Sequence, residues 1–322
     1  MPAPASTELH QLRRVSVGVQ RTALDRDCTA LRRCPHHSWP QASHVLVGLD
    51  LSAPFDTVNY DTLLERLQTE FSVTGTALAW LRSYLSDRSQ FIKLGRHQSP
   101  AVRLDVGVGQ GSVLGPLLFA VYCSPVGDTI AEHGVRYHQY ADDMQLHLAM
   151  RADNTGSGVS VLAACTSDVR LWYLQNGLQL NPDKSEALIV GTSPQLRQVT
   201  VAGVDMPVAA DIKVLGVVLD QRLTFDKYAK SVAKSCNYDA QAIRHIQQLL
   251  ILELAQTLAC SLILSKIDYC NALLHGAPTG SIQRLQWVQS NATRIVFQAP
   301  WRSDAKPLLR RLHWLPVEQR IT

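Results

Sequence analysis

Apolar and polar positions alternate in short segments over the first two thirds of the chain, whereas the last third repeats them with helical spacing. Residues 45–50 are an apolar run that ends on Asp50, a pattern typical of a buried strand that carries a carboxylate to the edge of a sheet. Residues 135–140 and 144–149 both alternate with a period of two around a short polar break. This pattern predicts a β-hairpin with Asp142 and Asp143 at its tip.

Helical and extended patterns alternate in the rest of this region. They predict helices over residues 61–71, 76–85, 113–122 and 159–175, strands over 90–94, 101–108, 187–190 and 213–219, and a turn over 181–186. From Asp226 onward the pattern is helical, with breaks near 276–280 and 299–301. The sequence therefore predicts an α/β (α+β) fold, in which an antiparallel sheet packs on helices and an all-helical lobe follows.

Three regions follow from these patterns. Residues 1–44 lack periodicity and are rich in Arg, Pro, Ser and His, which predicts an unstructured arm. We expect the α/β body over residues 45–220 and the helical lobe over residues 221–322. A chain of 322 residues with 46% hydrophobic positions is long enough and apolar enough to bury a substantial core in both.

Charge is distributed unevenly between the body and the lobe. Residues 45–220 hold 12 Lys and Arg against 18 Asp and Glu, a balance of −6, whereas residues 221–322 hold 13 against 6, a balance of +7. An acidic segment followed by a basic one suits a metal-holding body joined to a lobe that binds a polyanion. The competing explanation is that exposed helical surfaces simply carry Lys and Arg.

Cysteine usage and hydropathy point to an intracellular protein, nuclear or cytoplasmic. The seven cysteines are scattered without paired spacing, which favours reduced thiols. The N-terminal residues contain no continuous apolar run of the kind a secretory signal needs, so we expect a protein that is not secreted. Residues 249–267 are the most apolar helical run, but Glu253, Gln256 and Lys266 interrupt it. This predicts a buried amphipathic helix and no membrane span.

Asp50, Asp142 and Asp143 are the candidate functional residues that these patterns provide. Adjacent carboxylates repel each other unless a cation lies between them, and a divalent metal ion is a common solution. A solvated turn is the competing explanation for the Asp-Asp pair. Three glycines within residues 107–112 lead into the helix expected at 113. They permit close approach of the backbone to a ligand, and they equally permit a plain loop.

The order of these features resembles the reverse transcriptase of non-LTR (LINE-type) retrotransposons, and the resemblance covers about residues 45–322. The residues that carry it are Leu49 to Asp56 (LDLSAPFD), Gly109 to Phe119 (GQGSVLGPLLF), Tyr140 to Asp143 (YADD), Trp172, Asn176 to Leu178, Asn181-Pro182, Lys184, Val214 to Val217 (VLGV), Ile267 to Asn271 and Leu312 to Pro316. The resemblance implies a right-hand polymerase palm over residues 45–220. It implies an incomplete helical thumb or connection over residues 221–322.

The resemblance implies that Asp50, Asp142 and Asp143 hold two Mg²⁺ ions, which Mn²⁺ can replace. In-line phosphoryl transfer uses two metal ions to stabilise the attacking and leaving oxygens, and Mg²⁺ prefers hard oxygen ligands. By the same resemblance, the partners are an RNA template, a DNA primer and dNTPs, with no membrane and no obligate protein partner.

Four further residues take roles from the resemblance alone. Phe55 would stack under the incoming sugar and exclude a 2′-hydroxyl, although a plain core phenylalanine is the alternative. Gln110 and Gly111 would line the templating base. Lys184 would neutralise or protonate the leaving pyrophosphate, although a solvated lysine at a turn is the alternative.

The sequence departs from the family pattern in three places. Pro54 has no backbone N–H to offer to a triphosphate, and Gly109 stands where the family usually has proline. The fingers segment expected before Asp50 is absent or replaced by residues 1–44, and no endonuclease-like domain is present. We therefore expect a truncated element.

Two functions remain open at this point. The first is an RNA-directed DNA polymerase domain that adds dNTPs to a primer 3′-end, with activity impaired by the missing fingers. The second is a catalytically dead retrotransposon remnant, which is a folded domain with weak nucleic-acid binding.

Overall fold

The computed structural model describes residues 42–151, 155–191 and 197–321. The described residues form two compact units, 42–209 and 210–321. Residues 1–41 of the expected arm lie outside the described residues, and the first strand begins at Ala42. The expected boundaries at 44/45 and 220/221 stay a prediction.

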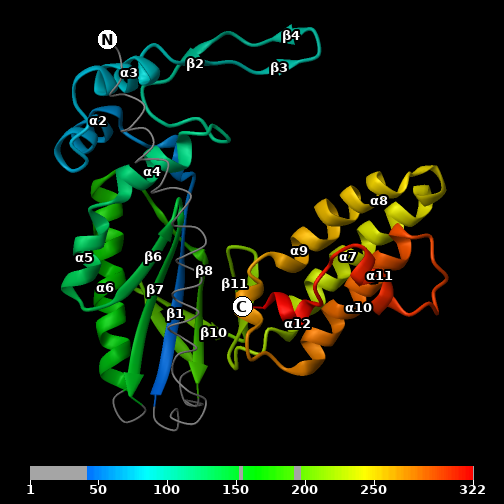
Figure 1. The fold of residues 1–322 in the computed structure, drawn as a ribbon. Coiled ribbons are helices and arrows are strands. Elements are labelled where there is room, and N and C mark those ends of the chain that lie inside the picture. Colours follow the sequence, from blue (N-terminus) through cyan, green and yellow to red (C-terminus); the bar gives the residue numbers. More distant parts are fainter. Residues whose placement is uncertain (1–41, 152–154, 192–196, 322) are drawn as a thin grey trace. The chain divides into compact units, whose positions relative to one another are not determined.

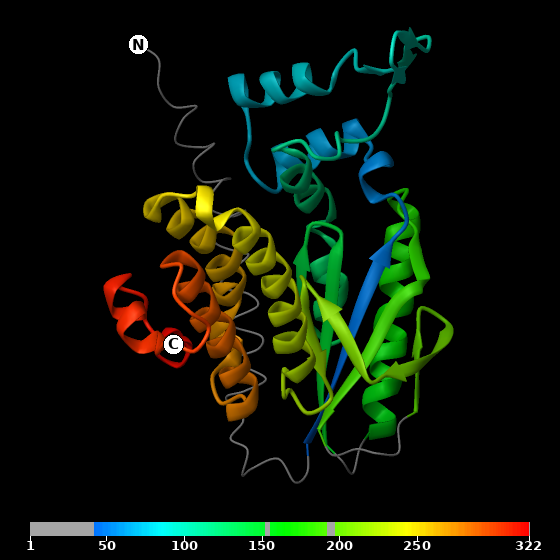
Figure 2. The same ribbon diagram turned by 90° about the vertical axis from the view of Figure 1, so that its right-hand side faces the viewer.

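The first unit is built on a six-stranded sheet with the strand order β6-β7-β1-β8-β10-β9 (Figures 1 and 2). Its strands are β1 (Ala42–Leu51), β6 (Arg136–Tyr140), β7 (Asp143–Arg151), β8 (Leu180–Gly191), β9 (Gln198–Val201) and β10 (Val204–Ala209). Neighbouring strands are antiparallel except β8 and β10, which pair in parallel. The predicted antiparallel sheet is thus confirmed with one parallel pair added.

β1 lies in the middle of the sheet, and its alternation decides which face is buried against helices. Val45, Val47 and Leu49 are at most 3% exposed and belong to the main hydrophobic core. Successive side chains of a strand point to opposite faces, so Asp50 lies on the other face from Leu49. The apolar run at 45–50 therefore forms the buried strand that the sequence predicts.

Five helices accompany the sheet: α2 (Tyr60–Thr69), α3 (Gly75–Leu85), α4 (Gly115–Cys123), α5 (Val126–Glu132) and α6 (Thr155–Gln175). Helices α5 and α6 run along one face of the sheet (Figure 1). Leu162, Val169 and Tyr173 of α6 are fully buried there, at the helical spacing that the sequence shows. Helix α5 was not predicted, because its seven residues are too few for a clear period.

Two small two-stranded sheets connect α3 to the segment before α4. β2 (Ser89–Gln90) pairs with β5 (Val102–Arg103), and β3 (Lys93–Leu94) pairs with β4 (His97–Gln98). They form a narrow arm that extends away from the helices (Figure 1). The strand pair predicted over 90–94 and 101–108 is therefore present, but each strand is only two residues long.

The second unit begins with a hairpin of β11 (Asp211–Val214) and β12 (Val217–Asp220). The single strand predicted over 213–219 is wrong, because Leu215 and Gly216 both have positive φ values, 45° and 85°, and reverse the chain.

Every element of the second unit after the hairpin is helical, as predicted. The helices are α7 (Asp226–Ile246), η3 (Gln247–Leu249), α8 (Leu252–Ala259), the π-helical turn η4 (Cys260–Leu264), α9 (Ser265–Asp268), η5 (Asn271–Leu274), α10 (Thr279–Val296), α11 (Ala305–Arg311) and α12 (Val317–Arg320). Buried small and apolar side chains of α7 and α10 recur at helical spacing, among them Ala233, Leu285 and Val288. None of the helices in the described residues is long and apolar enough to cross a membrane. The predicted α/β body followed by a helical lobe is confirmed.

Candidate active site

Asp50, Asp142 and Asp143 come together at one end of the sheet. The last residue pair between β1 and β7 is Leu49 with Met144. Asp50 follows Leu49 in β1, and Asp143 precedes Met144 in β7, so the two aspartates lie one step beyond this pair. Directly opposite residues project on the same face of a sheet. Asp142 precedes Asp143 in the tight turn between β6 and β7, in which Ala141 has a φ of 51°. The predicted hairpin and its register therefore make the three carboxylates neighbours.

The electrostatics of this group are unfavourable as it stands. Partial burial, followed by the negative charges of Asp142 and Asp50, raises the pKa of Asp143 above its ordinary value of 3.8. Oδ2 of Asp50 is buried and has no hydrogen-bond partner. Within the described residues, no lysine, arginine or histidine forms an ion pair with any of the three. The group lacks a positive charge that would balance it.

The donor set fits a hard divalent cation, although the side chains are not gathered around one point. Within residues 42–151, 155–191 and 197–321, no three His, Cys, Asp or Glu side chains are already close enough to hold a metal ion. Carboxylate oxygens are the ligands that Mg²⁺ prefers, and the orphaned Oδ2 of Asp50 is such an oxygen.

Phe55 lies just after β1, in the short helix η1 (Pro54–Asp56). Its half-buried ring packs on Phe119 of α4, with the ring centroids 5.1 Å apart. The backbone of η1 is held by Val108, whose N–H donates to the carbonyl of Phe55 over 2.8 Å. The structure thus supports packing of Phe55 against α4, and it also brings the glycine segment next to η1.

The glycine segment 107–112 runs from this contact into α4. Gly107 has a φ of 93°, and a Cβ there would lie 3.0 Å from the carbonyl oxygen of Asp56. Only glycine therefore fits this crossing without strain. Gln110 and Gly111 are exposed. Ser112 Oγ accepts a hydrogen bond from the N–H of Gly115 over 2.9 Å and so caps the start of α4.

Lys184 lies in a bulge of β8. The prediction of a turn over residues 181–186 is wrong, because these residues form a bulged strand. Those residues are all part of β8, but the ladder with β1 is irregular between Gly48 and Asp50. Gly48 lies opposite Glu186, and Asp50 lies opposite Asn181, so three extra residues of β8 are accommodated beside Asp50. The side chain of Lys184 is exposed.

Arg66 anchors the helices behind the site, a role that the sequence did not suggest. Its guanidinium donates to the carbonyl of Tyr122 and to Oδ1 of Asn176. It also lies over the rings of Tyr122 and Trp172, at 4.8 and 5.2 Å from their centroids. One cation thus joins α2, α4 and the end of α6. Two of its contacts, Trp172 and Asn176, belong to the motif that the family resemblance singled out.

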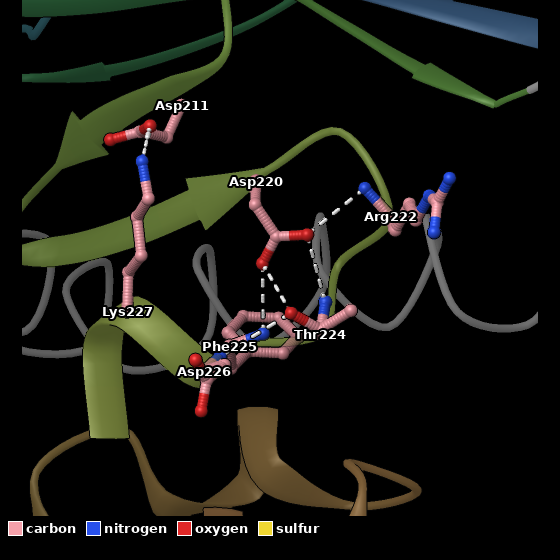
Figure 3. Close-up of polar contacts among 7 residues, drawn as sticks. All are labelled: Asp211, Asp220, Arg222, Thr224, Phe225, Asp226 and Lys227. Atoms are coloured by element: carbon pink, nitrogen blue, oxygen red, sulfur yellow. Dashed lines mark hydrogen bonds and ion pairs between the residues drawn. The ribbon is translucent and has the colours of Figure 1, made fainter. Parts of the chain in front are cut away.

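In the second unit, Asp220 connects the β11–β12 hairpin to α7 (Figure 3). Its Oδ1 accepts from the N–H groups of Arg222 and Thr224, at 3.0 and 3.1 Å. Its Oδ2 accepts from the hydroxyl of Thr224 and the N–H of Phe225, both at 3.0 Å. These four bonds fix the turn of residues 221–225 that leads into α7. The aspartate between an apolar strand and a helical pattern was a signal that sequence reasoning passed over.

A groove of about 560 Å³ lies between α7 and α10 of the second unit. It is lined by Lys230, Ala233, Lys234, Asn237, Tyr238, Gln241, Arg284, Trp287 and Val288. Lys230 and Arg284 form ion pairs with Asp226. The hydrogen bond from Lys230, and after it the one from Arg284, lowers the pKa of Asp226. Tyr238 and Trp287 are 76% and 46% exposed. The groove therefore combines positive charge with open aromatic surface.

Comparison with known proteins places these features in a family. The chain is 27% identical over 292 residues to the probable RNA-directed DNA polymerase from transposon BS of Drosophila melanogaster, covering 86% of this chain and 31% of that protein. It is 22% identical to the RNA-directed DNA polymerase from mobile element jockey of the same organism, covering 82% of this chain and 29% of that protein. The chain thus spans about a third of the length of these relatives.

Solved structures show a more distant likeness. A structure of telomerase from Candida tropicalis with a fragment of telomeric RNA covers 96% of this chain and 56% of that one, at 9% identity and a TM-score of 0.48. The corresponding telomerase from Candida albicans covers 96% of this chain and 58% of that one, at 12% identity and a TM-score of 0.46.

The family model for reverse transcriptase (RNA-dependent DNA polymerase) matches residues 9–219, which is more than half of the chain. The matched region contains Asp50, the glycine segment before α4 and the Asp142-Asp143 hairpin. Reverse transcriptases generally use divalent metal ions and a nucleic-acid template. By this match, and by its LINE-type relatives, the chain belongs to the reverse transcriptase family of non-LTR retrotransposons.

Proposed function

We propose that this chain is the polymerase segment of an RNA-directed DNA polymerase, which adds dNTPs to the 3′-end of a DNA primer on an RNA template. The observation that carries the proposal is the register of β1 and β7, which makes Asp50 and Asp143 neighbours next to Asp142. Membership of the reverse transcriptase family supports the same reaction.

In this proposal Asp50 and Asp142 are the main ligands of two Mg²⁺ ions, which Mn²⁺ can replace, and Asp143 helps to hold the second. Bound metal ions would supply charge stabilisation to the attacking and leaving oxygens of phosphoryl transfer. The raised pKa of Asp143 and the orphaned Oδ2 of Asp50 support this assignment, because both are what uncompensated carboxylates show.

The nucleotide side of the proposed site rests on Phe55, Gln110, Gly111 and Lys184. Phe55 is proposed to lie under the sugar of the incoming dNTP and to exclude a 2′-hydroxyl, and its packing on Phe119 would fix its ring. Gln110 and Gly111 are exposed at the start of the α4 segment, where a templating base could contact them. Lys184 is exposed in the bulge of β8, near Asn181, which pairs with Asp50. It is proposed to neutralise the leaving pyrophosphate.

The groove between α7 and α10 is proposed to contact the nucleic-acid backbone and bases. Lys234 is exposed and forms no ion pair among the described residues, so its charge is available to a phosphate. Trp287 offers an open aromatic face, and stacking of a base on such a face contributes about 1–3 kcal/mol. Oδ1 of Asn237, which also lines the groove, is buried and has no partner.

The proposed setting is the interior of the cell. Among the cysteines that the structure describes, Cys123, Cys165, Cys236 and Cys260 are free thiols. Free thiols suit a reducing compartment such as the nucleus or the cytoplasm.

A second candidate function is a folded remnant that binds nucleic acid and does not polymerise. Two observations favour it. Pro54, three residues after the end of β1, is buried and cannot offer a backbone N–H to a triphosphate. Among the described residues, the three carboxylates are neighbours without being gathered around a metal position.

Primer extension separates the two candidates. Purified protein, an RNA template with a DNA primer, dNTPs and Mg²⁺ are expected to give extended primer, and Asp142→Asn is expected to abolish it. Asp128→Asn is the matched control, because Asp128 is an exposed aspartate of α5. Extension that survives Asp142→Asn would contradict the polymerase proposal. Salt-dependent template binding without any extension would favour the remnant.

The groove is tested by filter binding over a salt series. Lys234→Ala is expected to weaken binding and to reduce the slope of log affinity against log salt by about one. Trp287→Ala is expected to weaken binding with the slope unchanged. Binding that is indifferent to both substitutions would contradict the groove as a nucleic-acid contact.

A further inference from the structure

The ladder between β1 and β8 is interrupted directly beside Asp50. If the pairing of Gly48 with Glu186 continued regularly, Asp50 would lie opposite Lys184, but it lies opposite Asn181. Three extra residues of β8 are therefore looped out next to the carboxylate that the proposed function needs most. A bulge leaves the local backbone less constrained by the ladder, so something else has to fix it.

The hydroxyl of Ser185 spans this bulge. Its Oγ accepts a hydrogen bond from the N–H of Asp50 over 3.2 Å and donates one to the carbonyl of Asn181 over 2.8 Å. A serine hydroxyl can accept and donate at the same time, so one side chain holds both members of the Asp50–Asn181 pair. Ser185 is 9% exposed, whereas its neighbours Lys184 and Glu186 are exposed.

No other side chain in the described part of the chain hydrogen-bonds Asp50. Its Oδ2 is buried without a partner, and Asp50 takes part in no ion pair there. The direction of the carboxylate is therefore set by the backbone of Asp50 and by packing, and Ser185 is the side chain that holds that backbone.

We propose that Ser185 is a positioning residue, which fixes the backbone of Asp50 and with it the direction of the metal-binding carboxylate. The inference rests on the proposed function, because it assumes that Asp50 binds a divalent cation. Residues that orient metal ligands typically change metal affinity or activity by about 10–100-fold when they are substituted.

A purely structural serine would behave differently. Loss of its two hydrogen bonds would lower the unfolding temperature and leave the affinity of the folded protein for metal unchanged. A positioning serine lowers metal affinity in protein that is still folded. Metal binding measured apart from polymerisation therefore distinguishes the two.

The experiment titrates Mn²⁺ into the full chain and follows free Mn²⁺ by electron paramagnetic resonance. Ser185→Ala is expected to raise the Mn²⁺ dissociation constant about tenfold, and to raise by a similar factor the Mn²⁺ concentration that gives half-maximal primer extension. Ser185→Thr keeps the hydroxyl and is expected to restore both. If Ser185→Ala does not fold, Ser185→Cys keeps the side-chain size, loses the strong hydrogen bonds and is expected to show the same loss.

Ser43→Ala is the matched control. Ser43 is a fully buried serine at the other end of β1, and its Oγ has no partner in the structure, so its loss is expected to leave Mn²⁺ binding unchanged. A Ser185→Ala protein that melts earlier but binds Mn²⁺ as the wild type does would overturn the inference.

Asp50→Asn separates failure of the inference from failure of the proposed function. If Asp50→Asn loses Mn²⁺ binding and Ser185→Ala does not, only the role of Ser185 is contradicted. If the wild type binds no Mn²⁺, or Asp50→Asn binds it as tightly as the wild type does, the metal-binding role of Asp50 fails, and the inference fails with it.

Discussion

Replacement of Asp220 by alanine tests how firmly the β11–β12 hairpin is joined to α7. The carboxylate accepts four hydrogen bonds of 3.0–3.1 Å, three from backbone N–H groups and one from the hydroxyl of Thr224 (Figure 3). Each hydrogen bond to a charged group contributes about 1.5–3 kcal/mol. Asp220 is half-buried, so water can hydrogen-bond to some of the groups that the carboxylate leaves, and this reduces the loss of stability.

We therefore expect Asp220→Ala to lower the free energy of unfolding by about 3 kcal/mol, because the turn before α7 loses its four hydrogen bonds. Urea denaturation followed by tryptophan fluorescence measures this, with an unchanged m value as the sign that only stability has changed. Asp304→Ala is the matched control, because Asp304 caps α11 with a single hydrogen bond, to the N–H of Lys306 over 3.0 Å. Its expected cost is about 0.5–1 kcal/mol. The reasoning is refuted if Asp220→Ala costs no more than Asp304→Ala.

Three further predictions concern the first unit. Because the raised pKa of Asp143 means that the folded state binds more protons than the unfolded chain, the contribution of Asp143 to the stability of the metal-free protein is greatest below about 3.8 and is lost as pH rises through its raised folded pKa. Asp143→Asn should therefore melt at a higher temperature than the wild type at pH 7 in a chelator, and a lower melting temperature would contradict this. Arg66→Ala should lower the free energy of unfolding, measured by urea denaturation, by about 2–4 kcal/mol. Arg66→Lys should restore less than half of that loss, because lysine lacks the planar guanidinium that makes both hydrogen bonds. Full restoration by lysine would contradict the role of the guanidinium geometry. Gly107→Ala should lower the free energy of unfolding by about 1–3 kcal/mol, because Gly107 has a φ of 93° and an alanine Cβ would lie 3.0 Å from the carbonyl oxygen of Asp56. An unchanged free energy of unfolding would show that the backbone relaxes.

The sequence predicts those parts of the fold whose periodicity is long and regular. The buried strand ending at Asp50, the hairpin at Asp142-Asp143 and the long helix α6 all appear where the apolar pattern places them. Each has one face against the core, so its side-chain alternation records burial directly. That the three carboxylates are neighbours depends in addition on the pairing of β1 with β7, which the local pattern does not predict.

Features that depend on distant residues could not be predicted from local pattern. The hydroxyl of Ser185 meets Asp50 across 135 positions, and Arg66 meets Asn176 across 110. The pattern over residues 213–219 predicts one strand in place of the hairpin of β11 and β12, because Leu215, an apolar residue, adopts the left-handed φ of its turn. The short helix α5 spans only two turns and leaves no clear period.

The most direct test of the central claim is to count divalent ions on the three carboxylates. Equilibrium titration of the wild-type chain with Mn²⁺, followed by electron paramagnetic resonance, is expected to show bound Mn²⁺ that Mg²⁺ displaces. Asp50→Asn and Asp142→Asn are each expected to remove this binding, and Asp128→Asn is expected to retain it. Mn²⁺ binding that is equal in all four proteins would contradict a metal site built from β1 and the turn between β6 and β7.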